Sequence, residues 1–200
     1  MDSIVPATSS GLGAVAPSPA IITLPGESSE LGALWRRYDA RPVRLVRTRE
    51  GRELSFSRFE RAHEFHEGME NIARRFDNSM SRFFYSAGIV AQLALSSHLL
   101  DVGFPDMWCA KYVGLHVDRS LAYANATGFG YEDAETKRLM EVLSPYWKWN
   151  TMSQMQGIEP GDGGFTQVSV AEIITALVEH VAEVTGHTLK PRRRAARSCS

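Results

Sequence analysis

The stretch from Phe83 to Leu100 contains 18 residues and not one Asp, Glu, Lys or Arg. A run of this kind is either a membrane-spanning helix or the central helix of a protein core. It contains Gln92, His98 and three serines, and buried amide and imidazole groups are costly in lipid. No cluster of Lys or Arg marks one flank of the run. We therefore interpret it as a buried helix and expect no membrane span.

The pattern inside this run predicts how it packs. At 100° per residue, Ala87, Ala91, Ala94 and His98 share one helical face, and small residues four apart let a neighbouring helix approach closely. A helix that is apolar over most of its circumference must be surrounded by other helices. The sequence therefore predicts a mainly α protein, a bundle of about five helices around a central helix at about residues 79–103.

Hydrophobic spacing and capping residues predict the surrounding helices. The residues from Ser169 to Glu172 form a capping box, and a clean apolar stripe follows it as far as Gly186. Residues 151–168 read as a loop. The other helices are expected at residues 29–38, 57–77, 105–127 and 132–144.

One segment reads as β structure. Two short alternating runs, Val43–Thr48 and Glu53–Phe56, lie on either side of a sequence that contains Gly51. Alternation interrupted by a glycine is typical of a β-hairpin. We predict a small N-terminal β-hairpin at about residues 43–56.

The ends of the chain differ in composition from its middle. Residues 1–27 are rich in Ser, Pro, Ala and Gly and are predicted to be disordered. Residues 28–187 are expected to form a single helical domain, and residues 188–200 a basic disordered tail. The N-terminus has no basic and apolar signal pattern, and Cys109 and Cys199 provide no disulfide framework. These features predict a cytoplasmic protein.

The net charge of −1 conceals strong segregation. Residues 36–61 carry +5, residues 62–189 carry −8 and residues 190–200 carry +5, and 18 of the 22 basic residues are Arg. Arg binds carboxylates and phosphates through two parallel hydrogen bonds. Glu50 and Glu53 weaken a nucleic-acid interpretation, and no helix-turn-helix or RNA-recognition signature is visible. The candidate nucleic-acid or partner-binding residues are Arg44, Arg47, Arg49, Arg52, Arg192, Arg193 and Arg194.

A second candidate surface is aromatic. Tyr146, Trp147 and Trp149 follow Pro145, which breaks or kinks the preceding helix. Together with Phe129 and Tyr131 these rings cannot all face one core after that break, and Tyr and Trp are common anchors of protein interfaces. We predict that they bind a partner, with the edge of the core as the alternative.

A histidine and glutamate cluster is the candidate for chemistry. His63, His66, Glu67 and Glu70 form two pairs four residues apart, so each pair shares a helical face. Such pairs can bind a metal or act as acid and base. The spacing matches neither zinc motif, H-E-x-x-H or H-x-x-E-H, and a solvated helix edge is the alternative interpretation. We expect no metal and no cofactor.

One histidine lies on each of several predicted helices, namely His66, His98, His116 and His180. Their convergence would create a metal or haem site, whereas isolated they are hydrogen-bonded core residues. The sequence contains no P-loop, dinucleotide fingerprint or nucleophile elbow. Our leading hypothesis is therefore a non-enzymatic interaction or assembly protein that binds protein partners or itself. The alternatives are a nucleic-acid-binding protein and a metal-dependent or acid-base helical enzyme.

Overall fold

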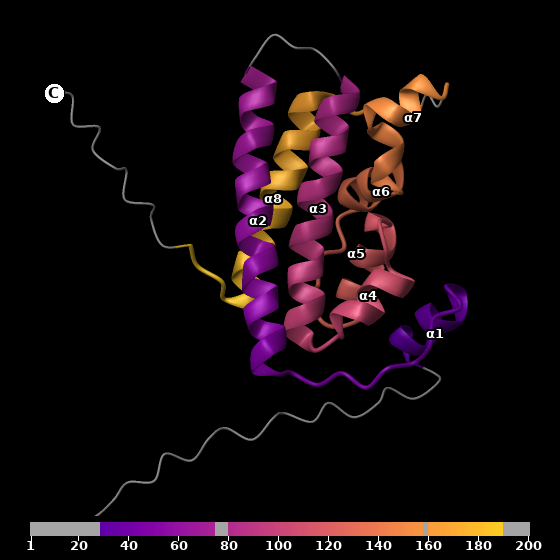
Figure 1. Cartoon of the computed structure of the whole chain (residues 1–200), viewed down its shortest axis with the longest axis vertical. Coiled ribbons are helices and arrows are strands. Elements are labelled where there is room, and N and C mark those ends of the chain that lie inside the picture. The colour runs from indigo at the N-terminus through magenta and orange to yellow at the C-terminus, as the bar shows by residue number, and fades with distance from the viewer. Residues whose placement is uncertain (1–28, 75–79, 158–159, 190–200) are drawn as a thin grey trace, which may run out of the picture.

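The computed structural model describes residues 29–74, 80–157 and 160–189 (Figure 1). Within these ranges the chain forms eight α-helices and one 3₁₀ turn, so the predicted mainly α class is confirmed. The disorder predicted for residues 1–27 lies outside the described residues, and so does the basic tail beyond residue 189. The division into one domain stays a prediction.

Helix α3 (Met80–Val102) is the centre of the described structure, as its charge-free run predicts. It packs against α2 (Arg49–Arg74) and α8 (Gln167–Thr185), which are the other two long helices. Figure 1 shows these three side by side, with α4, α5 and α6 next to α3 on one side. The shorter elements are α1 (Glu30–Arg37), α4 (Asp106–Tyr112), α5 (Val117–Asn125), α6 (Ala134–Leu143), η1 (Tyr146–Trp149) and α7 (Thr151–Met155).

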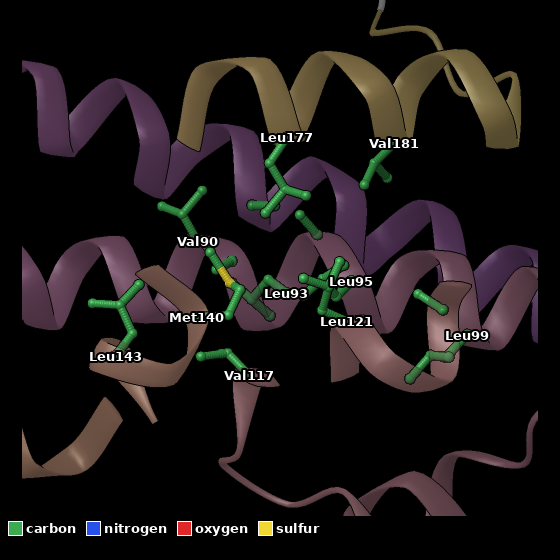
Figure 2. Close-up of a cluster of buried hydrophobic side chains, with 14 of the residues drawn as sticks. Val90, Leu93, Leu95, Leu99, Val117, Leu121, Met140, Leu143, Leu177 and Val181 are labelled. Carbon is green, nitrogen blue, oxygen red and sulfur yellow. The ribbon is translucent and has the colours of Figure 1, made fainter. Parts of the chain in front are cut away.

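Side chains from both sides of α3 form the core. Figure 2 shows Leu177 and Val181 of α8 on one side of α3, and Val117 and Met140 of α5 and α6 on the other. All four of these side chains are fully buried. Each buried aliphatic side chain stabilises the fold by about 1.5–3 kcal/mol before the entropy of ordering is subtracted.

Helix α3 is long and apolar enough to cross a membrane. It is the one such helix among the described residues, and most of it is buried against the rest of the protein. The central helix of a core passes the same length and composition test.

Polar caps define most of the helix starts. Ser29 accepts a hydrogen bond from the N–H of Gly32, and the helix predicted there begins at Glu30. The capping box of α8 is formed by Thr166 and Ser169, so the box predicted at residues 169–172 is placed one turn too late. Gly186 ends α8 in the left-handed conformation, with φ of 66°.

The predicted β-hairpin is wrong. Residues 49–56 are the first two turns of α2, and the hydroxyl of Thr48 caps them by accepting from the N–H of Gly51 at 2.9 Å. The helix also begins well before the predicted residue 57. Helical spacing places Ser55, Phe59 and Ala62 on one buried face of α2, which a strand could not do.

Two further predictions need correction. The helix predicted for residues 105–127 is divided into α4 and α5 at Gly114, whose φ of 58° is incompatible with a continuous helix. The loop predicted for residues 151–168 contains the short helix α7. Asn150 caps α7 by accepting a hydrogen bond from the N–H of Ser153.

Candidate functional site

The arginine strap, as we call residues 41–52, joins the end of α1 to the start of α2. Figure 1 shows it crossing below the ends of the helices. Its backbone is fixed at two points: the Trp108 indole N–H donates to the carbonyl of Arg41 at 2.7 Å, and the Val46 N–H donates to the carbonyl of Gly103 at 3.4 Å. Leu45 is buried between these points. The strap is therefore held against the ends of α3 and α4.

Gly103 shows how closely the strap approaches α3. A Cβ atom at this position would lie 2.6 Å from the backbone nitrogen of Val46, which is closer than atoms can pack. Its φ of 107° is also a conformation that glycine adopts more easily than other residues. Both facts require glycine where the strap crosses the end of α3.

The arginines of the strap fall into two groups. Arg41, Arg44 and Arg47 are exposed, and their side chains form no ion pair within the described parts of the chain. Arg49 instead contacts Glu53 at 2.8 Å on the surface, and Arg52 forms an ion pair with the buried Asp101. Arg52 remains about half exposed, with 51% of its side chain accessible.

The four predicted strap arginines, Arg44, Arg47, Arg49 and Arg52, thus lie on one short segment although the predicted hairpin does not form. No acidic residue occurs from residue 40 to residue 48. The three predicted tail arginines, Arg192, Arg193 and Arg194, lie outside the described residues.

The predicted aromatic surface is divided between core and solvent. Trp149 is buried, and its ring lies 4.5 Å from that of Phe84. Tyr146 is half-buried, and its ring lies 5.8 Å from that of Tyr85 on α3. Trp147 is 41% exposed. The structure thus favours the core-edge alternative for two of the three rings and leaves Trp147 accessible to a partner.

The predicted histidine and glutamate cluster is only loosely assembled. His63 Nδ1 lies 3.6 Å from Glu67 Oε1, and both side chains are partly exposed. His66 is buried, and its Nε2 lies 2.8 Å from the hydroxyl of Thr175. The side chain of Glu70 lies outside the described residues. No group of three or more His, Cys, Asp or Glu residues that could hold a metal ion occurs in the described ranges.

The other predicted histidines have structural partners. His98 is buried against the ring of Phe129 at 4.9 Å, and this burial lowers its pKa to about 4. The His180 ring also contacts Phe129, at 4.7 Å, and its Nε2 lies 2.7 Å from the Phe129 carbonyl oxygen. His116 precedes α5, and its Nδ1 lies 3.9 Å from Asp118 Oδ1. His98 and His180 thus share a structural contact with Phe129, and His116 has a different partner.

The sequence did not reveal a buried polar network that joins three helices. The Ser55 hydroxyl donates to the carbonyl of Ser97 at 2.8 Å and lies 2.7 Å from His187 Nε2. Burial, followed by the charge of Arg52, lowers the pKa of His187, while Asp101 opposes this shift. The residues are far apart in sequence, and the only local signal was Gly186, which ends α8 and turns the chain towards α2.

The distance between the Ser55 hydroxyl and His187 Nε2 is one that a nucleophile and its general base would have. The surroundings of the pair do not suit that role. Ser55 is completely buried, and its proton is directed at a backbone carbonyl, so substrate has no access to the hydroxyl. The contact therefore links α2, α3 and the end of α8 structurally.

Hollows on the described surface include two that lie near residues discussed above. One, of about 390 Å³, is lined by Arg52, Glu53, Phe56, Gly186, His187 and Thr188. The other, of about 430 Å³, lies between α1, α5 and α6, where Tyr38, Asp118 and Glu141 are among its lining residues. The first hollow directly adjoins the end of the arginine strap, because Arg52 belongs to both.

Comparison with known proteins gives no match: no protein-family model, curated protein or solved structure matches this chain significantly. The function is therefore inferred from the geometry of the strap and its surroundings.

Proposed function

We propose that this chain is a non-enzymatic binding module whose arginine strap contacts an acidic surface of a protein partner or of a second copy. The observation that carries this proposal is the exposure of Arg41, Arg44 and Arg47, without ion-pair partners in the described structure, on a backbone that is fixed to the fold. A helical bundle around α3 serves as the rigid support. Trp147 is a further contact point, and the basic tail with Arg192, Arg193 and Arg194 is an additional one.

The physical reason is the low cost of using such arginines. Guanidinium groups without a partner lose no internal ion pair when a carboxylate approaches them. A segment that is already held in place also loses less conformational entropy on binding than a flexible one. Arg forms paired hydrogen bonds to carboxylates, which Lys cannot do.

A second candidate function is nucleic-acid binding. It is favoured by the absence of any acidic residue from residue 40 to residue 48, which leaves that stretch uniformly positive. Phosphates would accept from the same guanidinium groups. The flanking Glu50 and Glu53 and the half-buried Phe56 make the surface more mixed than a phosphate-tracking one, so a protein partner ranks first.

A cytoplasmic location is part of the proposal, and so is the role of α3 as a core helix instead of a membrane span. The His63 cluster is not used in this proposal, since its described members belong to no group of three or more side chains that could hold a metal ion.

The proposal is tested by fluorescence anisotropy with three labelled probes: a peptide of alternating Glu and Ala, a single-stranded RNA and a duplex DNA. The strap variant replaces Arg41, Arg44 and Arg47 with Gln. A control variant, Arg61→Gln/Arg82→Gln/Arg138→Gln, removes the same charge elsewhere.

The wild-type protein should bind the acidic peptide, and the strap variant should bind it about tenfold more weakly, because three exposed contacts contribute about 0.5 kcal/mol each. The control variant should retain most of the affinity. Stronger binding to RNA or DNA, with an affinity that falls steeply between about 50 and 200 mM salt, would favour the second candidate. Equal losses in the two variants would show that only net charge matters and would refute the proposal.

A further inference from the structure

The hollow beside the strap combines charge with an apolar wall. Its lining includes the half-buried ring of Phe56 and the backbone of Gly186, which presents no side chain. Arg52 lies at its edge with its guanidinium tied to Asp101 and half of its side chain exposed. Glu53, the only acid in the lining, is engaged with Arg49. The hollow therefore presents a half-exposed, ion-paired guanidinium group beside an aromatic surface.

The far wall of the hollow is fixed in place. His187 Nε2 lies 2.7 Å from the Ser55 hydroxyl, and the His187 ring contacts Phe56 and Phe59 at 5.4 and 5.7 Å. This holds the chain after α8, from Gly186 to Thr188, against α2. The titratable and charged groups that face His187 are Arg52 and Glu53 on α2 and Asp101 on α3. The wall is thus held by contacts within the protein before any partner arrives.

We propose that this hollow receives an apolar anchor, most favourably an aromatic side chain, from an acidic peptide segment whose carboxylates contact the arginine strap. The inference rests on the proposed function, because the strap supplies the electrostatic attraction. Charge complementarity selects the occupant: Arg52 lines the hollow and is also the last residue of the strap, so an acidic segment bound along the strap leads to the hollow. Apolar anchors in a pocket with a charged rim are the usual arrangement of tight interfaces.

The experiment compares two labelled peptides by anisotropy. One alternates Glu and Ala, and the other is identical except that a central Ala is replaced by Trp. The wild-type protein should bind the Trp peptide at least tenfold more tightly, because an aromatic side chain that leaves water contributes strongly to affinity. Thr188→Trp places a bulky group in the hollow at an exposed position and should abolish this preference while the Ala peptide still binds. Val184→Trp adds the same side chain outside the lining and should preserve the preference.

The outcomes separate this inference from the proposed function. Equal binding of the two peptides to the wild-type protein would overturn the inference. If the strap variant still bound both peptides more weakly than the wild-type protein, the proposed function would stand. A Trp preference that survives in Thr188→Trp would place the anchor elsewhere and would also overturn the inference. If neither peptide binds, both proposals fail. Circular dichroism of each variant establishes that the helical fold is retained.

Discussion

Gly88 is the position where a single methyl group tests the packing of α3 most sharply. It is buried in the middle of α3, where η1 crosses the helix. A Cβ atom at Gly88 would lie 2.3 Å from the Cβ atom of Tyr146, well below van der Waals contact. Gly68 on α2 is the matched control, since a Cβ there would meet nothing within 4 Å. Both are helical glycines, so the two Gly→Ala changes share the same gain in helix propensity.

The expected magnitudes follow from these distances. Gly68→Ala should stabilise the protein by about 0.5–1 kcal/mol, because Ala loses less backbone entropy in a helix. Gly88→Ala has the same gain, but overpacking a core costs about 1–3 kcal/mol and occasionally more. Because the clash involves an atom next to the Tyr146 backbone, we expect the upper end and a net destabilisation of about 2 kcal/mol. In a protein of this size that lowers Tm by about 4–8 °C.

The assay is urea and thermal unfolding of both variants, followed by circular dichroism. The double variant Gly88→Ala/Tyr146→Gly removes the atom that the new methyl group would strike. It should therefore show a favourable coupling of about 1 kcal/mol or more relative to the sum of the single changes. If Gly88→Ala stabilised the protein as much as Gly68→Ala does, the packing of η1 on α3 described above would be refuted.

Three other predictions concern the described polar groups and the strap. Lowering the pH from 7.5 to 5 should destabilise the protein by about 2 kcal/mol through His98, because its folded pKa of about 4 lies below the unfolded 6.5, so the unfolded state binds the proton first. In His98→Gln the free energy of unfolding should depend less on pH across that range. If the change of this free energy with pH were the same as in the wild-type protein, His98 would not be its source. Gly103→Ala should destabilise by about 2 kcal/mol in urea unfolding, since its methyl group would strike the backbone of Val46; a neutral result would show that the strap is not held there. Ser55→Ala should cost about 1–3 kcal/mol because it leaves the buried His187 Nε2 without its partner, and a neutral effect in the same assay would dissociate the network from stability.

Helices with a strong internal pattern could be predicted from the sequence. The apolar stripe of α8 includes Val170, Ile174 and Leu177, all buried in the structure, and the charge-free run became the central helix. In both cases the residues that decide the structure lie within one element. Local pattern and tertiary packing then favour the same conformation.

The hairpin prediction was wrong because local pattern and tertiary packing favour different conformations there. The alternation from Glu53 to Phe56 fits a strand locally, but Ser55 finds its partner in Ser97, 42 residues away. A long-range contact of this kind overrides weak local preference and is invisible in a single sequence. The same holds for the pairing of Arg52 with Asp101.

The candidate site could be predicted in part from the sequence. Arg composition alone marked residues 36–61 as an exposed basic region, and the strap arginines are indeed on the surface. The sequence could not show which of these arginines form ion pairs within the protein, because those pairs depend on tertiary contacts. His187 was overlooked because Gly186 marks the end of α8 in the sequence but does not show which helix the following residues contact.

Native mass spectrometry of the protein purified from its own cells tests the central claim most directly. We predict that the wild-type protein carries a protein partner or a second copy, that the variant with Arg41, Arg44 and Arg47 replaced by Gln loses it, and that the charge-matched control retains it. A wild-type protein that runs as a monomer without a partner, or a complex that the strap variant retains undiminished, would contradict the account.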